Sequence, residues 1–163
     1  MKQIPLTQGK YAIIDDEDYE YLSQFKWRVN AYGYAIREQY LGVENGKRKR
    51  INIFMHRLIV ETPEGKETDH INGERNDNRR CNLRVCTRYE NQRNTKKQPN
   101  CTSKYKGVSL HKRDKIWQAQ IRTDGKVKYL GSFRSEDDAR NAYDEAAIYH
   151  FGEYAKPNFE KVA

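Results

Sequence analysis

The sequence has few of the features that mark secreted or membrane proteins. Its three cysteines, Cys81, Cys86 and Cys101, form no CxxC pair, and an odd count argues against a disulfide framework. A zinc site on Cys81 and Cys86 stays open, although it lacks the paired spacing that zinc sites usually show. No apolar run approaches the ~20 residues needed to cross a bilayer, and residues 1–10 do not resemble a signal peptide. We therefore expect no membrane partner and a cytoplasmic location.

Apolar residues are also scarce, at 36% of the 163 residues, while charged residues make up 33%. This composition predicts small folded units with thin cores, and the length favours one or two domains. Lys and Arg number 31 against 23 Asp and Glu, which gives a net charge of +8, and the excess is spread along the chain. A spread basic excess suits a polyanionic partner, although a merely soluble basic protein fits the composition equally well.

The first segment, residues 1–55, has the pattern of a small mixed α+β unit. Alternating apolar side chains predict strands near residues 11–14, 26–29, 34–36 and 51–54. The segment 16–25 begins with acidic residues and predicts a short helix, because acids stabilise a helix N-terminus. The basic run 47–50 is expected in the turn before the last strand, where it is either solvated or in contact with phosphates.

Residues 56–98 predict a hairpin followed by a helix. Asn72-Gly73 is a turn signal, and residues 83–85 can return as the second strand. Thr87 and Glu90 form a capping box, which predicts a helix from residue 88 to about residue 97. The segment is therefore predicted to form a strand, a loop, a second strand and a helix, with the helix packed against the hairpin.

The side chains of this segment suit phosphodiester hydrolysis, which needs a base to activate water and a cation to stabilise charge on the phosphate. His70 is the expected base, because histidine titrates near neutral pH. Carboxylate and amide oxygens prefer hard ions, so Asp69 and Asn91 are the expected ligands of one Mg²⁺ or Mn²⁺. Asn82 is expected to orient His70 by accepting a hydrogen bond from the other ring nitrogen. Asn94 should share a helix face with Asn91.

A run of residues here closely resembles the HNH nucleases of the phage and intron-homing type. The matching residues are Asp69-His70-Ile71-Asn72-Gly73, Asp77-Asn78-Arg79, Asn82-Leu83-Arg84, Glu90-Asn91 and Asn94. The resemblance implies a ββα-metal fold in which His70 activates water, Asp69 and Asn91 hold one divalent ion, and Asn82 orients His70. It makes Asn94 a supporting residue behind the ligands. The last letter of the motif is Asn rather than His in this chain.

The same resemblance extends to flanking residues. Residues 56–60 match the short strand that usually precedes the motif, and Arg57 and Arg84 are expected to contact DNA. An Asn-rich turn that happens to contain Asp and His would give a similar local pattern. The joint spacing of the four principal residues, with a capped helix at the right place, favours the nuclease.

Residues 104–159 predict three strands and a helix, after a polar linker at residues 99–103. Asp124-Gly125 is a hairpin turn signal, and Ser135 and Gly152 are start and stop signals for the helix. Side chains alternate along the middle strand, so that Gln118, Gln120 and Arg122 should face away from the helix while Trp117, Ala119 and Ile121 face it. A sheet face with Gln and Arg can pair with base edges in the major groove, although an ordinary solvated sheet has the same periodicity.

This segment resembles the plant ethylene-response-factor (AP-two) DNA-binding domain. The residues that carry the resemblance are Tyr105-Lys106-Gly107-Val108, Trp117, Ile121-Arg122, Leu130-Gly131-Ser132-Phe133, Ala142-Tyr143-Asp144-Glu145-Ala146-Ala147 and Asn158-Phe159. The resemblance implies that the sheet lies in the major groove, with Lys106, Gln120, Arg122 and Tyr129 toward DNA and Lys128 beside the backbone. Ser109 and Val127 stand where that family often has arginines, so a target sequence does not carry over.

These patterns together predict an α+β protein in four parts: a mixed segment 1–55, an HNH motif 56–98, a linker 99–103 and an AP-two type domain 104–159. The expected function is a metal-dependent DNA endonuclease of homing or phage type, which nicks or cuts double-stranded DNA and is targeted by its last domain. If a phage encodes it, the host cytoplasm is its location. No protein partner is implied, and monomer and dimer are both open. The alternatives are a non-catalytic DNA-binding transcriptional regulator and, with least support, an RNA-binding module.

Overall fold

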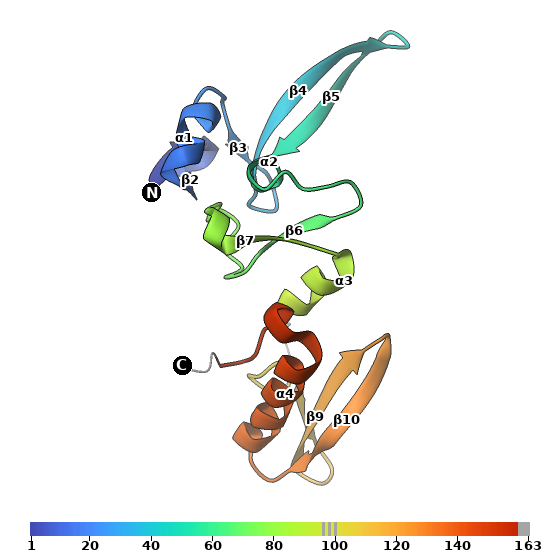
Figure 1. The fold of residues 1–163 in the computed structure, drawn as a ribbon. Coiled ribbons are helices and arrows are strands. Elements are labelled where there is room, and N and C mark those ends of the chain that lie inside the picture. The colour runs from blue at the N-terminus through green and yellow to red at the C-terminus, as the bar shows by residue number, and fades with distance from the viewer. Residues whose placement is uncertain (96, 98, 100, 160–163) are drawn as a thin grey trace. The chain divides into compact units, whose positions relative to one another are not determined.

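The computed structural model describes residues 1–95, 97, 99 and 101–159 of the chain. It divides into two compact units, Met1–Asn91 and Gln92–Ala163, both drawn in Figure 1. Each unit mixes helices with small antiparallel sheets, so the predicted α+β class is confirmed. None of the described helices is both long and apolar enough to cross a membrane.

The first unit opens with a hairpin and a helix. Strand β1 (Lys2–Pro5) pairs antiparallel with β2 (Tyr11–Ile14), the 3₁₀ turn η1 (Thr7–Gly9) joins them, and helix α1 (Asp16–Leu22) follows. The predicted helix extended to Phe25, but α1 ends at Leu22. There the Trp27 indole N–H donates to the Leu22 carbonyl over 2.9 Å, a hydrogen bond that satisfies one free carbonyl at the helix end.

The next sheet has the strand order β3-β4-β5 and contains a long hairpin. Strand β3 (Arg28–Val29) pairs with β4 (Ala35–Glu44), which pairs with β5 (Lys47–Phe54). Asn45 and Gly46 form the turn, both with positive φ, as a two-residue type I′ turn requires. The basic run 47–50 therefore lies in β5, and its predicted place in the turn was wrong, because Asn45-Gly46 is the stronger turn signal.

Residues 56–60 do not form the predicted strand. They lie in helix α2 (Met55–Ile59) and its C-terminal residue Val60. Met55, His56 and Ile59 are buried, and this spacing of one and four residues places them on one side of a helix, whereas a strand would alternate them. The apolar core of this unit joins residues of β1, β2, α1, β3, β4 and α2 with Trp27 and Leu83.

The expected strand, loop, strand and helix follow. Strand β6 (Glu67–His70) pairs antiparallel with β7 (Leu83–Cys86), and the loop between them contains the 3₁₀ turn η2 (Arg80–Asn82). Helix α3 (Arg88–Asn91) begins at the predicted capping box, in which the Thr87 and Glu90 backbone amides each donate to the other's side chain. It is shorter than predicted: the 3₁₀ turn η3 (Gln92–Asn94) follows, and residue 96, in its expected last turn, lies outside the described residues.

The second unit is a three-stranded antiparallel sheet against one long helix. Its strands are β8 (Val108–His111), β9 (Ile116–Thr123) and β10 (Lys126–Phe133), in the order β10-β9-β8, and they are followed by helix α4 (Glu136–Phe151) and the 3₁₀ turn η4 (Gly152–Tyr154). The Asp124-Gly125 turn and the Ser135 cap are confirmed, since the Ser135 hydroxyl accepts from the Asp137 amide over 3.1 Å.

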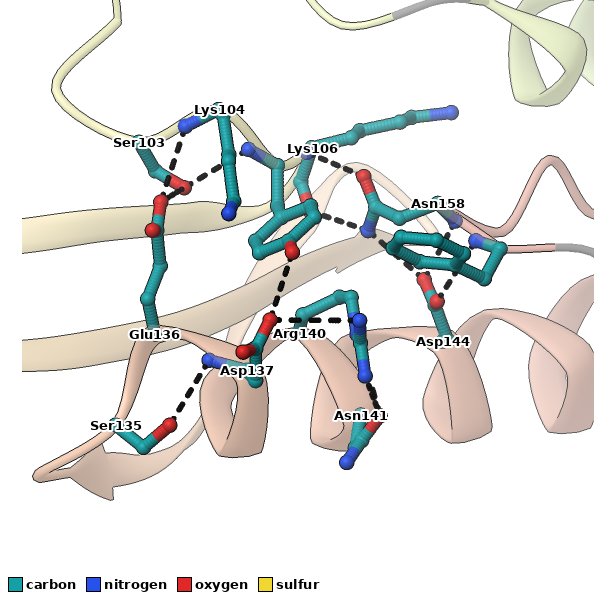
Figure 2. A network of polar contacts seen from close by, with 12 residues as sticks. Ser103, Lys104, Lys106, Ser135, Glu136, Asp137, Arg140, Asn141, Asp144 and Asn158 are labelled. Atoms are coloured by element: carbon teal, nitrogen blue, oxygen red, sulfur yellow. Dashed lines mark hydrogen bonds and ion pairs between the residues drawn. The ribbon is translucent and has the colours of Figure 1, made fainter.

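A polar network ties the segment before β8 and the end of the chain to α4, as Figure 2 shows. Ser103, which falls in the predicted linker 99–103, is buried and donates to Glu136 over 2.7 Å. Residue 100 of that linker lies outside the described residues. Asn158 accepts from the Lys106 amide and donates to Asp144, so the last described residues return to the helix.

Candidate active site

His70 lies at the end of β6, opposite Leu83 of β7, with 5% of its surface exposed. Its Nε2 is 3.2 Å from Oδ1 of Asn78, a side chain with 0% exposure. The Asn78 amide nitrogen donates to the carbonyl of Asn76 over 3.4 Å, which turns the amide oxygen toward His70. An oxygen at that position accepts a hydrogen bond from Nε2–H, so Nδ1 is the ring nitrogen that can accept a proton.

The surroundings of His70 keep the imidazole neutral. Burial lowers the pKa of His70, and this effect outweighs the hydrogen bond to Asn78 and the negative charges of Asp69 and Asp77, which raise it. A neutral imidazole has a lone pair and can act as a base at neutral pH. The electrostatics of the buried ring therefore match the base role expected from the sequence.

Asn82 was expected to orient His70, but its own hydrogen bonds close the loop between β6 and β7. Its oxygen accepts from the Asn72 amide over 3.0 Å, and its nitrogen donates to the Asp77 carbonyl over 2.7 Å. The hydrogen bond to His70 is made by Asn78, which was not among the predicted site residues. The Asn-Asp-Asn run at 76–78 was the available signal, because such residues stabilise tight loops through side-chain bonds to the backbone.

The loop is held from outside by the N-terminal hairpin. Ile13 in β2 accepts from the Asn78 amide and donates to the Asn76 carbonyl, both over 2.8 Å. Arg80 donates to Asp18 over 2.7 Å, and its backbone amide donates to the Asp15 side chain over 2.8 Å. The residues that position Asn78 thus include part of segment 1–55, whose role the sequence did not reveal.

A second buried histidine packs against the first. The rings of His56 and His70 lie edge to face with centroids 5.0 Å apart, and Tyr34 and Phe54 contact His56 at 5.1 and 5.5 Å. Burial lowers the pKa of His56 to about 3, with smaller contributions from His70 and Arg57. Within the described structure, His56 Nδ1 has no hydrogen-bond partner. His56 is therefore a neutral ring packed against the candidate base.

Asp69, an expected ligand, forms a close ion pair. Its Oδ2 accepts from Arg84 Nε over 3.0 Å and from Arg84 Nη2 over 2.7 Å, and Asp69 is 5% exposed. Arg84 was expected to contact DNA, but here its guanidinium lies on Asp69. A cation bound at Asp69 would share that carboxylate with Arg84.

Asn91, the other expected ligand, donates from Nδ2 to Oε2 of Glu67 over 2.6 Å. Its amide oxygen is therefore the atom that a cation would bind. Glu67 and Asp69 are two residues apart in β6 and share one face of the strand. Two carboxylates and an amide oxygen are the donors that hard ions prefer, so this face fits Mg²⁺ or Mn²⁺. Glu67 was not predicted from the sequence.

Other metal arrangements have less support. Within the described residues, no three His, Cys, Asp or Glu side chains gather into a metal-binding group. The cysteines considered for zinc are free, with Cys81 exposed and Cys86 buried. The expected supporting residue Asn94 lies in η3, which belongs to the second unit.

The sheet of the second unit displays most of the residues expected to face DNA. Gln120 and Arg122 are exposed on β9, and Tyr129 of β10 is paired with Gln120. Lys128, also exposed, is paired with the buried Ile121, which places it by register on the other face of the sheet. The predicted alternation is confirmed on the helix side, because Ala119 and Ile121 are buried against α4 residues.

Lys106, also expected to face DNA, is partly buried. Its ammonium donates to the carbonyls of Arg93 and Thr95 over 3.0 and 2.8 Å. Burial, together with the charges of Arg93 and Lys156, lowers the pKa of Lys106 to about 8. In this structure the side chain holds the start of the second unit together.

Part of the chain that contains the site is similar to known nucleases. Residues 54–93 match the family model described as HNH endonuclease. Over 153 residues the chain is 26% identical to an uncharacterised HNH endonuclease of Acanthamoeba polyphaga mimivirus, across 93% of this chain and 76% of the relative. Both matches support an HNH nuclease. The matched segment contains α2, β6, β7, α3 and all four principal site residues.

A second group of relatives comes from plants. The chain is 43% identical over 60 residues to an ethylene-responsive transcription factor of Arabidopsis thaliana, which is 36% of this chain and 14% of that relative. It is 48% identical over 58 residues to an AP2-like ethylene-responsive transcription factor of the same plant, 34% of this chain and 12% of the relative. The chain thus spans only a small part of these plant proteins, and the similarity is consistent with an AP2-like DNA-binding segment.

Proposed function

We propose that the protein is a metal-dependent DNA endonuclease whose base is His70. One observation carries the proposal. His70 is buried, neutral and oriented by Asn78, and it directly follows Asp69, which lies on the face of β6 that bears oxygen donors. Hydrolysis of a phosphodiester needs both a base and a cation site. The match of residues 54–93 to the HNH endonuclease model supports the same assignment.

In the proposed reaction, His70 Nδ1 removes a proton from a water molecule as its oxygen attacks phosphorus. The new P–O bond forms while the bond from phosphorus to the leaving sugar oxygen breaks, and the sugar oxygen takes a proton from solvent. Asn78 holds the Nε2–H of the ring throughout, so that the developing imidazolium stays in place. One phosphate monoester end and one hydroxyl end result.

Asp69 and Asn91 would hold the divalent ion, with Glu67 orienting the Asn91 amide. When bound, Mg²⁺ or Mn²⁺ supplies positive charge beside the scissile phosphate. Arg84, paired with Asp69, adds a further positive charge at this face.

We assign recognition to the second unit, at residues 104–159. Gln120, Arg122 and Tyr129 on its exposed sheet are the proposed contacts to double-stranded DNA, in a homing or phage-type enzyme that nicks or cuts both strands. Joining a site with weak sequence preference to a separate DNA-binding unit raises overall affinity through effective concentration. The HNH segment would then cut near the position at which the second unit binds.

The test is cleavage of supercoiled plasmid by the full chain with Mg²⁺, Mn²⁺ or EDTA. We expect nicked or linear product with a metal, none with EDTA, and none from His70→Ala. The matched control is His150→Ala, which removes an exposed histidine of α4 and should cleave as the wild type does. Persistent cleavage by His70→Ala would contradict the assignment of the base.

The alternative, transcriptional regulation without cleavage, is not favoured, although the plant relatives that match about a third of this chain are named as transcription factors. It predicts sequence-specific DNA binding, no cleavage with any divalent metal, and identical binding by wild type and His70→Ala. The same experiment, run beside a gel-shift assay, separates the two functions.

A further inference from the structure

The β4–β5 hairpin extends beyond the core of its own unit. Buried residues occur only at its base, where Ala35 and Ile36 join the core, while residues 43–52 are all exposed. Figure 1 shows the two strands reaching away from α1, α2 and β6 of the same unit. At about 3.3 Å per residue, the exposed part is roughly 20 Å long. We call residues 38–52 the arm.

The two faces of the arm differ, because side chains alternate along a strand and paired residues share a face. On one face, Arg37 stacks on the Phe25 ring at 4.2 Å, and its partner Ile53 lies beside it. Lys47, Lys49 and Ile51 continue that face on β5. The other face, the arginine face, carries Arg48 and Arg50 with Asn52 and Phe54 on β5, opposite Val43, Tyr40, Glu38 and Ile36 on β4.

The arginine face runs into the candidate active site. At its base, Phe54 contacts His56 at 5.5 Å, and His56 contacts His70 at 5.0 Å. A hollow of about 390 Å³ opens at the same place, lined by Asn52, Ile53, Phe54, Arg57 and Leu58. A strand of nucleic acid in this hollow would pass Arg57 and Asn52 on its way to the arm.

The arginine face carries a net positive charge. Glu38 accepts from Arg28 over 3.2 Å and from Arg50 over 3.1 Å, so its single negative charge is shared by two guanidinium groups and the cluster stays positive. Tyr40 is 56% exposed and Val43 is 64% exposed on the same face. A face of arginines interleaved with exposed apolar and aromatic side chains suits the phosphates and sugars at the edge of a groove.

We propose that the arm binds double-stranded DNA beside the cleavage position, with its arginine face against the phosphate backbone. The proposal rests on the proposed nuclease function, which places DNA at His70. A two-stranded hairpin fits in the major groove, and an isolated one is marginal in water, so binding DNA would also stabilise the arm. The arm would be a third DNA contact, in addition to the HNH site and the sheet of the second unit, and would fix the direction in which DNA leaves the HNH site.

The test compares two full-length double variants of equal charge change. Arg48→Glu with Arg50→Glu alters the arginine face, and Lys47→Glu with Lys49→Glu alters the opposite face of the same strand. Both are made in the His70→Ala background, so that binding is measured without cleavage. The probe is a duplex containing a site cut by the wild type or, if none is cut, a random-sequence duplex.

We expect the arginine-face variant to weaken binding at least tenfold. The slope of log affinity against log salt, which is negative, should become less steep by about 2, because each lost phosphate contact reduces its magnitude by about 0.9. Hydroxyl-radical footprinting should show loss of protection on one side of the cut. The lysine-face variant should keep the footprint and weaken binding less. Arg48→Lys with Arg50→Lys should restore most of the affinity, and unchanged thermal unfolding would show that the variants fold.

Two outcomes would overturn the proposal. Equal weakening by both glutamate variants, with an unchanged footprint, would mean that only overall charge acts. Unchanged binding by both would remove the arm from the DNA interface. If the wild type cleaves and the arm variants bind normally, the arm proposal fails alone. If the wild type never cleaves but the arginine-face variant alone loses affinity for the random-sequence duplex, the nuclease function fails and the arm remains a DNA contact.

Discussion

At the scale of single residues, the site depends on a side chain that the sequence motif did not predict. Asn78 is fully buried, and its amide is held by the Asn76 carbonyl, so that it presents an oxygen to His70. Asp69, His70, Asn82 and Asn91 were predicted because their types match the chemistry. Asn78 was missed because its role depends on the path of a twelve-residue loop between β6 and β7, from Ile71 to Asn82, which local patterns do not determine.

Replacing Asn78 should therefore slow cleavage by more than any loss of fold stability would explain. In Asn78→Ala the buried Nε2–H loses its partner, which costs about 1–3 kcal/mol, and the ring can adopt the wrong tautomer. We expect the single-turnover cleavage rate to fall roughly 5- to 100-fold. The control Asn76→Ala keeps the carbonyl to which Asn78 donates and should cut at a rate near that of the wild type.

His56 makes the stability of the first unit depend on pH. Its folded-state pKa of about 3 is below the unfolded value of 6.5, so the unfolded chain binds more protons between these values. This contribution to stability is then complete above about pH 8 and declines as the pH falls, by about 2 kcal/mol between pH 8 and pH 5.

This decline can be measured by urea unfolding in EDTA, followed through the fluorescence of Trp27 in a Trp117→Phe background. His56→Phe should flatten the pH dependence but not abolish it, because burial lowers the pKa of His70 in the same direction. An unchanged slope in His56→Phe would show that other groups cause it.

At the scale of elements, turns and caps were predictable, and elements fixed by long-range packing were not. Asp124-Gly125 and Ser135 have short-range signatures, and β9, β10 and the start of α4 lie where these predict. Segment 56–60 was expected to be a strand from its resemblance to the HNH nucleases, yet it is helical because Met55 and Ile59 both reach the core of the first unit. The basic run 47–50 was misplaced because a highly charged segment has no apolar alternation to mark it as a strand.

One element-scale prediction concerns the close contact between Gly107 and α4. A Cβ added to Gly107 would lie 1.9 Å from Tyr143 Cδ2, and the φ of +76° disfavours any other residue. Gly107→Ala should therefore destabilise the second unit by about 2–5 kcal/mol.

Gly125→Ala is the matched control, since its φ is +74° but a Cβ there meets nothing within 4 Å. It should cost about 1–2 kcal/mol, the backbone strain alone. Urea unfolding of both variants gives the difference, and equal losses would mean that Tyr143 moves aside without cost.

At the scale of the whole molecule, chemistry and recognition are assigned to different units. Removing a base-edge contact in the second unit should weaken binding and leave the chemical step intact. Such a contact is worth about 1–3 kcal/mol, so Arg122→Ala should raise Kd for a preferred duplex roughly 5- to 100-fold. The single-turnover rate at saturating protein should match that of the wild type.

Lys126→Ala is the control for this prediction. It removes the same charge beside the same turn, but Lys126 is paired with the buried Thr123 and lies by register on the other face of the sheet from Arg122. It should raise Kd only slightly, by a similar amount for all sequences. A fall in the cleavage rate of Arg122→Ala at saturation would mean that the second unit takes part in the chemical step.

The bonds between Ile13 and the loop at 76–78 bear on how such a motif can be moved between proteins. The segment that matches the HNH endonuclease model begins at residue 54, whereas the backbone that closes its loop is at residue 13 and the acids that hold Arg80 are at 15 and 18. A transplant of residues 54–93 into another scaffold would carry the reactive side chains without their support. A working chimera must therefore retain the N-terminal hairpin or supply another strand whose backbone can bond to the loop. The smallest segment that can be transferred is longer than the motif.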